Sequence, residues 1–595
     1  MGDRLIQRWR WCLLLCLVTA QAVAGPLGLP DSARPGAVRP EEVGKQTVPA
    51  KPPASTLKVP PVIDRPFEID EGPRVVVNRF RLLDARDLPE FNITLDEVQQ
   101  LLQGLIEKKP EGFTIGQLQE VSDAVTKYYR EKGLILAQSV VPVQTVQTGT
   151  VDIQVFEGKL GRILAEGNKM YSEEMLRKPF KHLIGKPVTK DAIESALLTL
   201  TDFPGLSVFG VFQPGRQVGT ADILLKVQNE KHFDVSYRID NHGLTETGTR
   251  RFRPELVWNN PTGGADRLSI TLQQTYHPKN NLFRTFNYEH YLANGFTAGL
   301  TINRNSFDVG GDLAAQQIFG QTDQQSLFLQ KSWIRSRQLN LSSTFTVERK
   351  QSKTTVRQRR SNVDRLSVFT LGFDFDNVDT RFKGINFATL EINRGVNNLF
   401  GAMSSSGDAL NLPAGLRPSR QGGPSNPKFA AGQFTSVNAT ASRLQTLRPN
   451  LSLLLRAEYQ WTKDLLVPLQ QYSVGGPDNV RSFPQAQQLL DRALFVSAEF
   501  IQNMPFITDV PAFANRTWGE LIQLSAFFDE AIGRLNSPLQ SDPQGYVKFR
   551  GAGVQVRFTL PSLIESRLMW AWEVGSDEAD NGRRPQIWGD FTYRF

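Results

Sequence analysis

Downstream of His232 the chain alternates apolar and polar residues in short segments, without the 3.6-residue spacing of a helix. Sixteen such segments follow one another, from Phe233–Asp240 to Ile587–Phe595, eleven before and five after a loop at residues 471–484. The 364 residues after residue 231 allow about 23 residues per strand and loop, which is ordinary for a membrane barrel. A sheet in lipid must close to satisfy its backbone polar groups. The pattern therefore predicts a 16-stranded antiparallel transmembrane β-barrel over residues 231–595.

Two patterns with helical periodicity precede the barrel. In residues 73–158, Thr94 and Thr114 each begin a capping box that opens a helix, and an alternating strand follows at Val151–Phe156. Residues 159–230 repeat this order in variant form. The sequence therefore predicts two tandem α/β modules, each with the order β-α-α-β-β.

The first 72 residues have a different composition. Arginines followed by an apolar run, and Ala-Val-Ala before Gly25, predict a secretory signal peptide at residues 1–24. Prolines recur in residues 25–72, and because such a segment is extended and buries no core, we interpret it as a tether. Both cysteines, Cys12 and Cys16, lie in the signal peptide, which excludes disulfide scaffolds, zinc–cysteine sites and thiol nucleophiles from the mature chain.

Composition and charge narrow the possible functions further. No stretch of about 18 consecutive apolar residues follows the signal peptide, so no helical membrane span is predicted. The formal net charge of +8 is modest for 595 residues and contains no long Lys/Arg block, so nucleic acid is not an expected partner. The five histidines are scattered, and neither G-x-S-x-G nor H-E-x-x-H occurs. We therefore expect no metal, no cofactor and no enzymatic activity.

The loop at residues 471–484 reads Q-Y-S-V-G-G-P-D-N-V-R-S-F-P and consists largely of turn-forming residues. Gly475 and Gly476 lie at its base, and Arg481 lies close to the apolar Val480 and Phe483. A single cation flanked in this way, inside an all-β array, suggests a plug or latch. Spacing alone also allows an ordinary charge on a solvated loop.

Several strings resemble two-partner secretion transporters, the haemolysin and filamentous-haemagglutinin secretion-activation family of the barrel-assembly superfamily. V-P-V-Q at 141–144 and G-T-V-D-I-Q-V-F-E-G at 149–158 look like the first POTRA domain of that family. D-N-H-G at 240–243 with N-P-T-G at 260–263 resembles the signature that opens its barrel. The terminal aromatic alternation ending at Phe595 is similar to the signal by which outer-membrane barrels are recognised for insertion, and it disfavours a soluble propeller.

The resemblance also implies a pore-loop site. In that family the sixth extracellular loop folds back into the pore, and its V-R-G-[FY] tip meets an aspartate of an F-x-D-x-G strand motif. The matching residues are Val480, Arg481, Ser482 and Phe483 in the tip, and Phe527 and Asp529 on the strand. Ser482 and Ala531 replace the two family glycines, and a tip that needed a positive φ would be strained by serine. Asp529 as a solvated pore residue is the alternative, and Glu530 is expected to point away from it.

The resemblance implies a type V secretion transporter in the outer membrane of a Gram-negative cell, with the POTRA modules in the periplasm. Such a transporter moves one dedicated, unfolded exoprotein to the cell surface. The modules would recognise its N-terminal secretion domain by adding a strand to a sheet edge, either Val151–Phe156 or Ser207–Gln213. Outer-membrane lipid and, during biogenesis, the barrel-assembly machinery are the other expected partners. A barrel-assembly insertase is the main alternative, and an outer-membrane hydrolase and a porin are two more.

Overall fold

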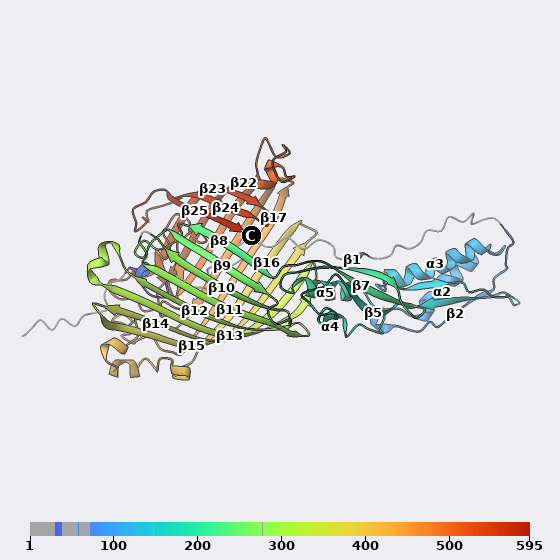
Figure 1. The fold of residues 1–595 in the computed structure, drawn as a ribbon, viewed down its shortest axis with the longest axis horizontal. Coiled ribbons are helices and arrows are strands. Elements are labelled where there is room, and N and C mark those ends of the chain that lie inside the picture. Colours follow the sequence, from blue (N-terminus) through green and yellow to red (C-terminus); the bar gives the residue numbers. More distant parts are fainter. Residues whose placement is uncertain (1–29, 38–56, 59–71, 147, 277) are drawn as a thin grey trace, which may run out of the picture.

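The computed structural model describes residues 30–37, 57–58, 72–146, 148–276 and 278–595. The predicted signal peptide at residues 1–24 lies outside the described residues, as does most of the predicted tether at 25–72. Figure 1 shows a barrel at one end of the molecule and two small modules in line beside it. We call the barrel end next to the modules the module end, and the opposite end the loop end.

The first module contains the predicted elements in the predicted order. They are β2 (Arg79–Leu83), the short helix η3 (Pro89–Phe91), α2 (Leu95–Glu107), α3 (Ile115–Glu131), β3 (Gln138–Val140) and β4 (Thr150–Phe156). The capping box of Thr114 is complete, because its hydroxyl accepts from the Gln117 amide and the Gln117 side chain accepts from the Thr114 amide. Thr94 caps α2 in only one direction, since the Glu97 carboxylate instead accepts from the Lys132 ammonium at 3.0 Å.

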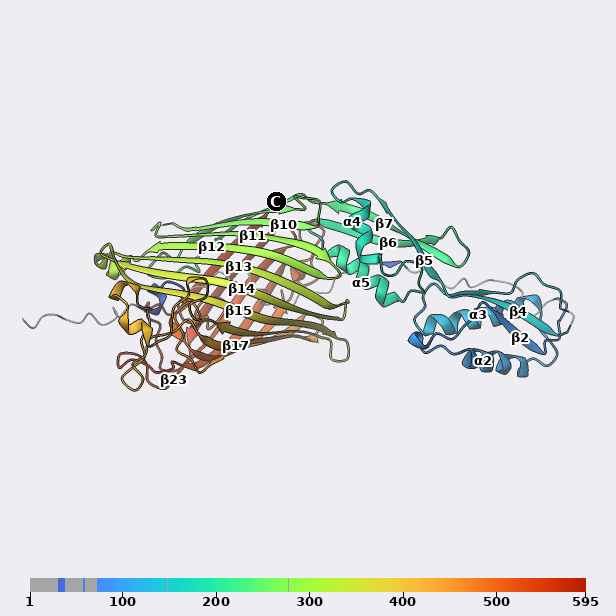
Figure 2. The same ribbon diagram turned by 90° about the horizontal axis from the view of Figure 1, so that it is seen from below.

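The second module repeats the order and lies between the first module and the barrel (Figure 2). Its elements are β5 (Lys159–Glu166), α4 (Glu173–Arg177), η4 (Lys178–Phe180), α5 (Lys190–Thr201), β6 (Leu206–Pro214) and β7 (Thr220–Glu230). The sheet has the order β1-β6-β7-β5, and β1 is the two-residue strand Leu57–Lys58, which pairs in parallel with Gly210 and Val211 of β6. A piece of the predicted tether therefore covers part of one sheet edge.

The sheet orders decide between the two edges proposed from sequence. In the first module the order is β2-β4-β3, so Val151–Phe156 lies at the centre of its sheet and is not an edge. That prediction was wrong because β4 pairs with β2 in parallel, a long-range pairing that the local alternation does not encode. Ser207–Gln213 lies in β6, whose outer side pairs, within the part of the chain that the structure describes, with β1 alone.

Sixteen strands close into an antiparallel barrel, as predicted. They are β8 (Phe233–Asp240), β9 (Arg251–Asn259), β10 (Asp266–Thr275), β11 (Asn281–Ala293), β12 (Phe296–Asp308), β13 (Ile318–Arg335), β14 (Leu339–Val356), β15 (Arg359–Asp379), β16 (Gly384–Gly395), β17 (Phe434–Arg448), β18 (Leu451–Thr462), β21 (Arg492–Asn503), β22 (Ile522–Arg534), β23 (Tyr546–Leu560), β24 (Ile564–Glu573) and β25 (Gln586–Arg594). Large apolar side chains such as Leu327, Phe345 and Leu455 are exposed on the outer face, as a lipid-facing wall requires. The first and last strands, β8 and β25, are joined across only five residue pairs.

The connections differ between the two ends of the barrel. At the loop end, the segment 396–433 carries η6 (Leu399–Gly401), η7 (Asp408–Asn411) and η8 (Ala414–Leu416), and the short helix η5 (Gly311–Gln316) lies between β12 and β13. The segment 463–491 contains the small hairpin β19 (Tyr472–Val474) and β20 (Gln488–Leu490). At the module end, one long turn between β21 and β22 contains α6 (Trp518–Leu521). Among the described residues no helix is both long and apolar enough to span a membrane.

The second module is fixed to the barrel by charged and aromatic contacts. Arg335, at the end of β13, donates two hydrogen bonds of 2.7 and 2.6 Å to the carboxylate of Asp202. Arg337, in the next turn, forms a salt bridge with Glu194 of α5. The ring of Phe203 lies 5.0 Å from that of Tyr291 on β11. The second module therefore contacts the barrel at β11, at the end of β13 and in the turn that follows β13.

Candidate functional site

The sixth loop at the loop end is held in a folded hairpin inside the barrel. Tyr472 pairs with Leu490 and Val474 with Gln488, so β19 and β20 form the two arms of the loop. Gly475, with φ of 97°, follows the first arm, and a side chain there would meet the Pro484 carbonyl oxygen at 2.2 Å. Gly476 has φ of 104°. The predicted glycine base is therefore a tight turn that only glycine fits without strain.

Arg481 at the loop tip binds two carboxylates on the barrel wall. Its Nε and Nη2 donate to the two Asp529 oxygens, each at 2.8 Å, and its backbone amide donates to Asp529 Oδ2 at 3.1 Å. Its Nη1 donates to Glu499 Oε2 at 2.6 Å, and Nη2 also reaches Ser497 Oγ at 3.2 Å. The Asp529 residue is 0% exposed and Arg481 is 4% exposed. Neither the solvated loop charge nor the solvated Asp529 that the sequence left open fits this geometry.

Aromatic groups complete the surroundings of the guanidinium. The Arg481 guanidinium carbon lies 3.4 Å from the centre of the Phe527 ring, in a cation–π arrangement. The indole Nε1 of Trp588 on β25 donates to the Arg481 carbonyl at 2.7 Å. The tip is thus bound to β21, β22 and β25 together, and the last of these closes the barrel against β8.

Sequence reasoning missed Glu499, Ser497 and Trp588. Glu499 and Ser497 occupy alternate, inward-facing positions of β21, and Ser497 pairs directly with Asp529 across the sheet. A carboxylate on the inward face of a strand next to the predicted partner strand was the available signal. The register between β21 and β22, which places Glu499 beside the arginine, cannot be read from either strand alone.

The two departures from the family pattern are accommodated by small neighbours. Ser482 is not among the residues with positive φ, so the predicted strain is absent. Its hydroxyl packs against Gly551 of β23, where a side chain would lie 2.1 Å from the Ser482 oxygen. Phe483 is fully buried with its ring 5.0 Å from that of Phe549, in a cluster that also contains Val480 and Ala531. Replacing glycine by Ser482 and Ala531 therefore leaves the tip in a packed apolar cluster.

Glu530 points away from Asp529, as predicted. The carboxylate of Glu530 pairs with Lys548 of β23 at 2.6 Å, and the register between β22 and β23 shows no bulge. The tip also carries Asp478, whose carboxylate lies 3.3 Å from Arg567 of β24, and Arg567 in turn donates to Asp590 of β25 at 2.9 Å. A second set of ionic contacts therefore links the loop to the closing strands.

A second buried arginine ties the base of this loop to the long loop 396–433. Arg420 donates through Nη1 and Nη2 to the two Asp491 oxygens, the second at 2.7 Å, and Asp491 is 0% exposed. The backbone amides of Leu466 and Asn536 also donate to Asp491, at 3.2 and 2.6 Å. Three loops are therefore joined at Asp491, which precedes β21 directly.

Residues 30–37 lie inside the barrel near the loop end, far from β1 (Figures 1 and 2). The short helix η1 (Asp31–Ala33) places Asp31 so that its Oδ2 accepts from the Leu489 amide at 2.8 Å and the Gln488 side chain at 2.7 Å. Ala33 packs against Phe307 and Ile318 of the wall. A helix at this position had no sequence signal.

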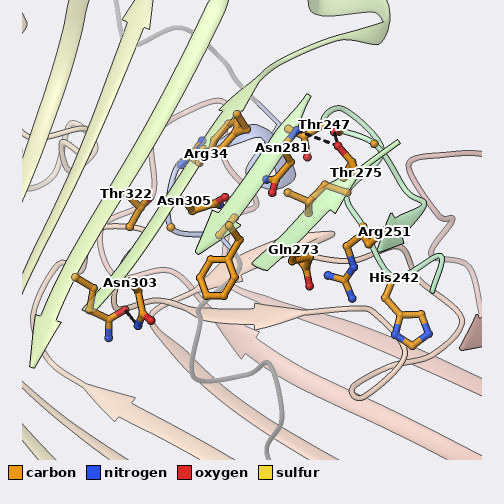
Figure 3. A pocket seen from close by; sticks show the side chains of 18 residues that line it. Arg34, His242, Thr247, Arg251, Gln273, Thr275, Asn281, Asn303, Asn305 and Thr322 are labelled. Atoms are coloured by element: carbon orange, nitrogen blue, oxygen red, sulfur yellow. Dashed lines mark hydrogen bonds between the residues drawn. The ribbon is translucent and has the colours of Figure 1, made fainter. Parts of the chain in front are cut away.

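Figure 3 shows the narrow space left between this segment and the wall, where Arg34 faces polar side chains of β12 and β13. This cavity is only about 40 Å³, enough for little more than water. A larger cavity of about 880 Å³ runs along the barrel interior beneath the loop, lined by charges of both signs such as Arg253, Glu289 and Lys350. Within the described part of the chain, no group of three or more His, Asp or Glu side chains could hold a metal ion.

The C-terminal Phe595 continues the last strand to the module end. Its amide donates to the Val235 carbonyl at 2.9 Å, and its ring lies 4.7 Å from that of Tyr593 and 5.5 Å from that of Tyr237. The ring remains 61% exposed. The terminal aromatic residue is therefore accessible at the closing seam.

Comparison with known proteins finds relatives of both the first module and the barrel. A family model described as haemolysin secretion/activation protein ShlB/FhaC/HecB matches residues 219–513, and a ShlB-type POTRA domain model matches residues 79–158. Heme/hemopexin transporter protein HuxB of Haemophilus influenzae is 22% identical over 526 residues, covering 86% of each chain. Outer membrane transporter CdiB of Escherichia coli is 24% identical over 436 residues, covering 70% of this chain and 67% of that protein.

Two solved structures share the fold of most of this chain. CdiB from Escherichia coli superposes with a TM-score of 0.66 at 20% identity, covering 90% of this chain and 94% of that one. CdiB from Acinetobacter baumannii gives a TM-score of 0.59 at 17% identity, covering 93% and 96%. This chain therefore shares its fold with both structures over most of its length.

Proposed function

The chain belongs to the haemolysin secretion/activation family of two-partner secretion transporters, and from this membership we propose that Arg481 locks its pore loop until a client exoprotein arrives. As a member of that family it lies in the outer membrane with its POTRA modules in the periplasm, and it exports an exoprotein. The loop end is then extracellular, and the module end is periplasmic.

The observation that carries the lock is the simultaneous binding of Arg481 to Asp529 and Glu499 inside the barrel. Two carboxylates on the pore wall would be costly to bury without a cation, and a guanidinium meets both with directed hydrogen bonds. The loop hairpin therefore stays in the lumen, where it occludes the path of a polypeptide. Residues 30–37 add a second obstruction beside it.

We further propose that the client secretion domain binds the edge of β6 in the second module. Among the described residues, only Leu57 and Lys58 pair with the outer side of the nine-residue strand β6, at Gly210 and Val211. An extended client strand that pairs with more of β6 would form more backbone hydrogen bonds than this two-residue partner. Client binding would then displace β1, which belongs to the same N-terminal region as the segment inside the barrel.

The remaining roles follow from this mechanism. Translocation needs no chemical step, and we propose that the chain is not an enzyme. Apolar side chains on the outer barrel face would contact outer-membrane lipid. The exposed Phe595 would serve the barrel-assembly machinery as an insertion signal during biogenesis, in keeping with its position at the closing seam.

The proposal is tested by deleting the gene and comparing surface and supernatant proteins with those of the parent by mass spectrometry. We expect the loss of one large exoprotein while other outer-membrane barrels are unchanged. Complementation with the wild-type chain should restore it, and complementation with Arg481→Ala should not, although the variant barrel inserts. A general fall in barrel proteins would instead indicate an insertase. An unchanged protein profile would leave a porin or a hydrolase.

A further inference from the structure

One periplasmic turn differs from all the others in the barrel. The segment 504–521 joins β21 to β22 with 18 residues, whereas the other six turns at this end have two to six. Transmembrane barrels ordinarily keep their periplasmic turns short. The length of this turn therefore needs a reason other than joining two strands.

The turn has an ordered backbone that is closed by hydrogen bonds across it. The Ala512 amide donates to the Arg516 carbonyl at 2.7 Å, and the Trp518 and Gly519 amides donate to Val510 and Thr508 at 3.0 Å. The backbone of 508–519 thus continues as a small hairpin of its own. In Figure 1 the segment, with its single helical turn, projects from the barrel wall beyond the end of β22.

The hairpin folds against the lipid side of the barrel. The ring of Phe513 lies 6.1 Å from that of Phe558 on β23. Phe558 shares its face of β23 with the exposed Val554 and Val556, whereas Gln555 between them is buried toward the lumen. Phe513 is therefore continuous with the outward, apolar surface of the barrel.

The hairpin also presents apolar side chains that the protein leaves uncovered. Phe506 is fully exposed, and Phe513 and Val510 are 47% and 45% exposed. Phe506 has φ of 67°, a left-handed conformation that is unfavourable for a bulky residue. A strained backbone that holds an aromatic ring out of the protein is unexpected in water, and it is explained if the ring enters another apolar medium.

We propose that residues 504–521 form a membrane anchor that inserts Phe506, Val510 and Phe513 among the phospholipids of the periplasmic leaflet of the outer membrane. Aromatic side chains are favoured at the boundary between lipid chains and headgroups. The anchor lies at the end of β21 and β22, which carry Glu499 and Asp529, so it holds in place the strand pair that binds Arg481. This inference rests on the membrane location of the barrel and is independent of the loop lock.

Site-directed spin labelling tests the anchor. In a background with Cys12→Ser and Cys16→Ser, which leaves no native cysteine, Phe506→Cys carries a nitroxide, and the full chain is reconstituted in phosphatidylethanolamine/phosphatidylglycerol vesicles. Electron paramagnetic resonance then measures collisions of the label with oxygen, which partitions into lipid, and with a water-soluble nickel chelate. Leu327→Cys, exposed on the outer face of β13, is the lipid reference, and Val218→Cys, exposed in the second module, is the water reference. Heat-dependent electrophoretic mobility verifies that each barrel is folded.

We expect the label at residue 506 to show the high oxygen and low nickel accessibility of the lipid reference. Nickel accessibility equal to that of the Val218 label would overturn the proposal. So would a label that is shielded only after the client secretion domain is added, since the hairpin would then dock a protein. A second reporter at Val510→Cys should become several-fold more accessible to nickel when Phe506→Ser and Phe513→Ser are introduced. The same reporter should not respond to Phe400→Ser, which changes an exposed phenylalanine on an extracellular loop.

Discussion

Replacing Arg481 is the sharpest test of how the pore loop is held. Arg481→Ala removes the side chain that pairs with both Asp529 and Glu499, and these residues are 0% and 5% exposed. Arg481 is the cation that both carboxylates share, so the variant leaves two buried charges near one another, with only neutral donors such as Ser497 at Asp529 and Ser525 at Glu499. Arg481→Lys keeps one positive charge but cannot bind both oxygens of Asp529 and reach Glu499 as well.

The magnitudes follow from the burial of the site. Removing one partner of a buried ion pair costs about 3–5 kcal/mol, because the remaining charge stays desolvated. At 1.4 kcal/mol per tenfold change, the docked loop would lose on the order of a hundred- to a few thousand-fold in its equilibrium against the released loop. For Arg481→Lys we expect the docked loop to lose about 1.5–3 kcal/mol of stability, the contribution of a hydrogen bond to a charged group.

Single-channel conductance in planar bilayers measures the release of the loop from the pore. Client secretion in cells measures transport. Arg481→Ala should give frequent large openings and abolish secretion, Arg481→Lys should be intermediate, and the exposed Arg583→Ala should match the wild type. If Arg481 acts through its contacts with Asp529 and Glu499, the effect of the double variant Arg481→Ala/Asp529→Asn will be much smaller than the sum of the two single effects. Wild-type conductance and secretion in Arg481→Ala would refute the reasoning.

Four further variants test the surrounding contacts. Glu499→Gln removes one of two carboxylates and should raise open probability less than Arg481→Ala does; an equal effect would mean that Asp529 contributes little. Arg420→Ala should cost about 3–5 kcal/mol, because Asp491 stays buried, and should speed proteolysis of the extracellular loop that carries Arg420; an unchanged cleavage rate would contradict this. Asp31→Ala removes an acceptor for two donors of β20 and should raise resting conductance, whereas unchanged conductance would exclude a blocking role. Gly475→Ala places a methyl group 2.2 Å from a carbonyl oxygen and should release the loop, so normal secretion would argue against the tight base.

The fold could be predicted from sequence wherever the determining pattern is local. Alternation marks each strand of the barrel by itself, so the count of sixteen strands is confirmed. Alternation does not mark the full lengths of β13 to β15, because these strands continue past the apolar band with polar residues on both faces. The order of the strands within the module sheets could not be predicted from the sequence, because the parallel pairing of β4 with β2 joins residues about 70 positions apart.

The same distinction applies to the site. Arg481 and Asp529 could be predicted to meet because each lies in a short motif with its own sequence signature. Glu499 and Trp588 carry no such motif, and they reach the loop tip only through the register and closure of the barrel. The proline-rich composition of the N-terminal region predicts an extended chain, but not that Asp31 caps the amide of Leu489.

In the function proposed above, the contacts of the extracellular loop 463–491 account for how client binding in the periplasm would open the pore without a chemical energy source. Its tip is held by Arg481, its second arm by Asp31, and its base by Arg420 through Asp491. Each of these attachments exchanges the hydration of polar groups for buried polar contacts. Its net contribution to the stability of the docked loop is therefore smaller than the free energy lost when only one of the two partners is removed. A process that removes residues 30–37 therefore takes away the support of the second arm and leaves the tip held by ionic contacts into which water can enter. Hydration of Arg481, Glu499 and Asp529 together then returns most of the free energy that breaking their contacts requires. The loop can thus be stable at rest and still yield to the free energy of binding a client.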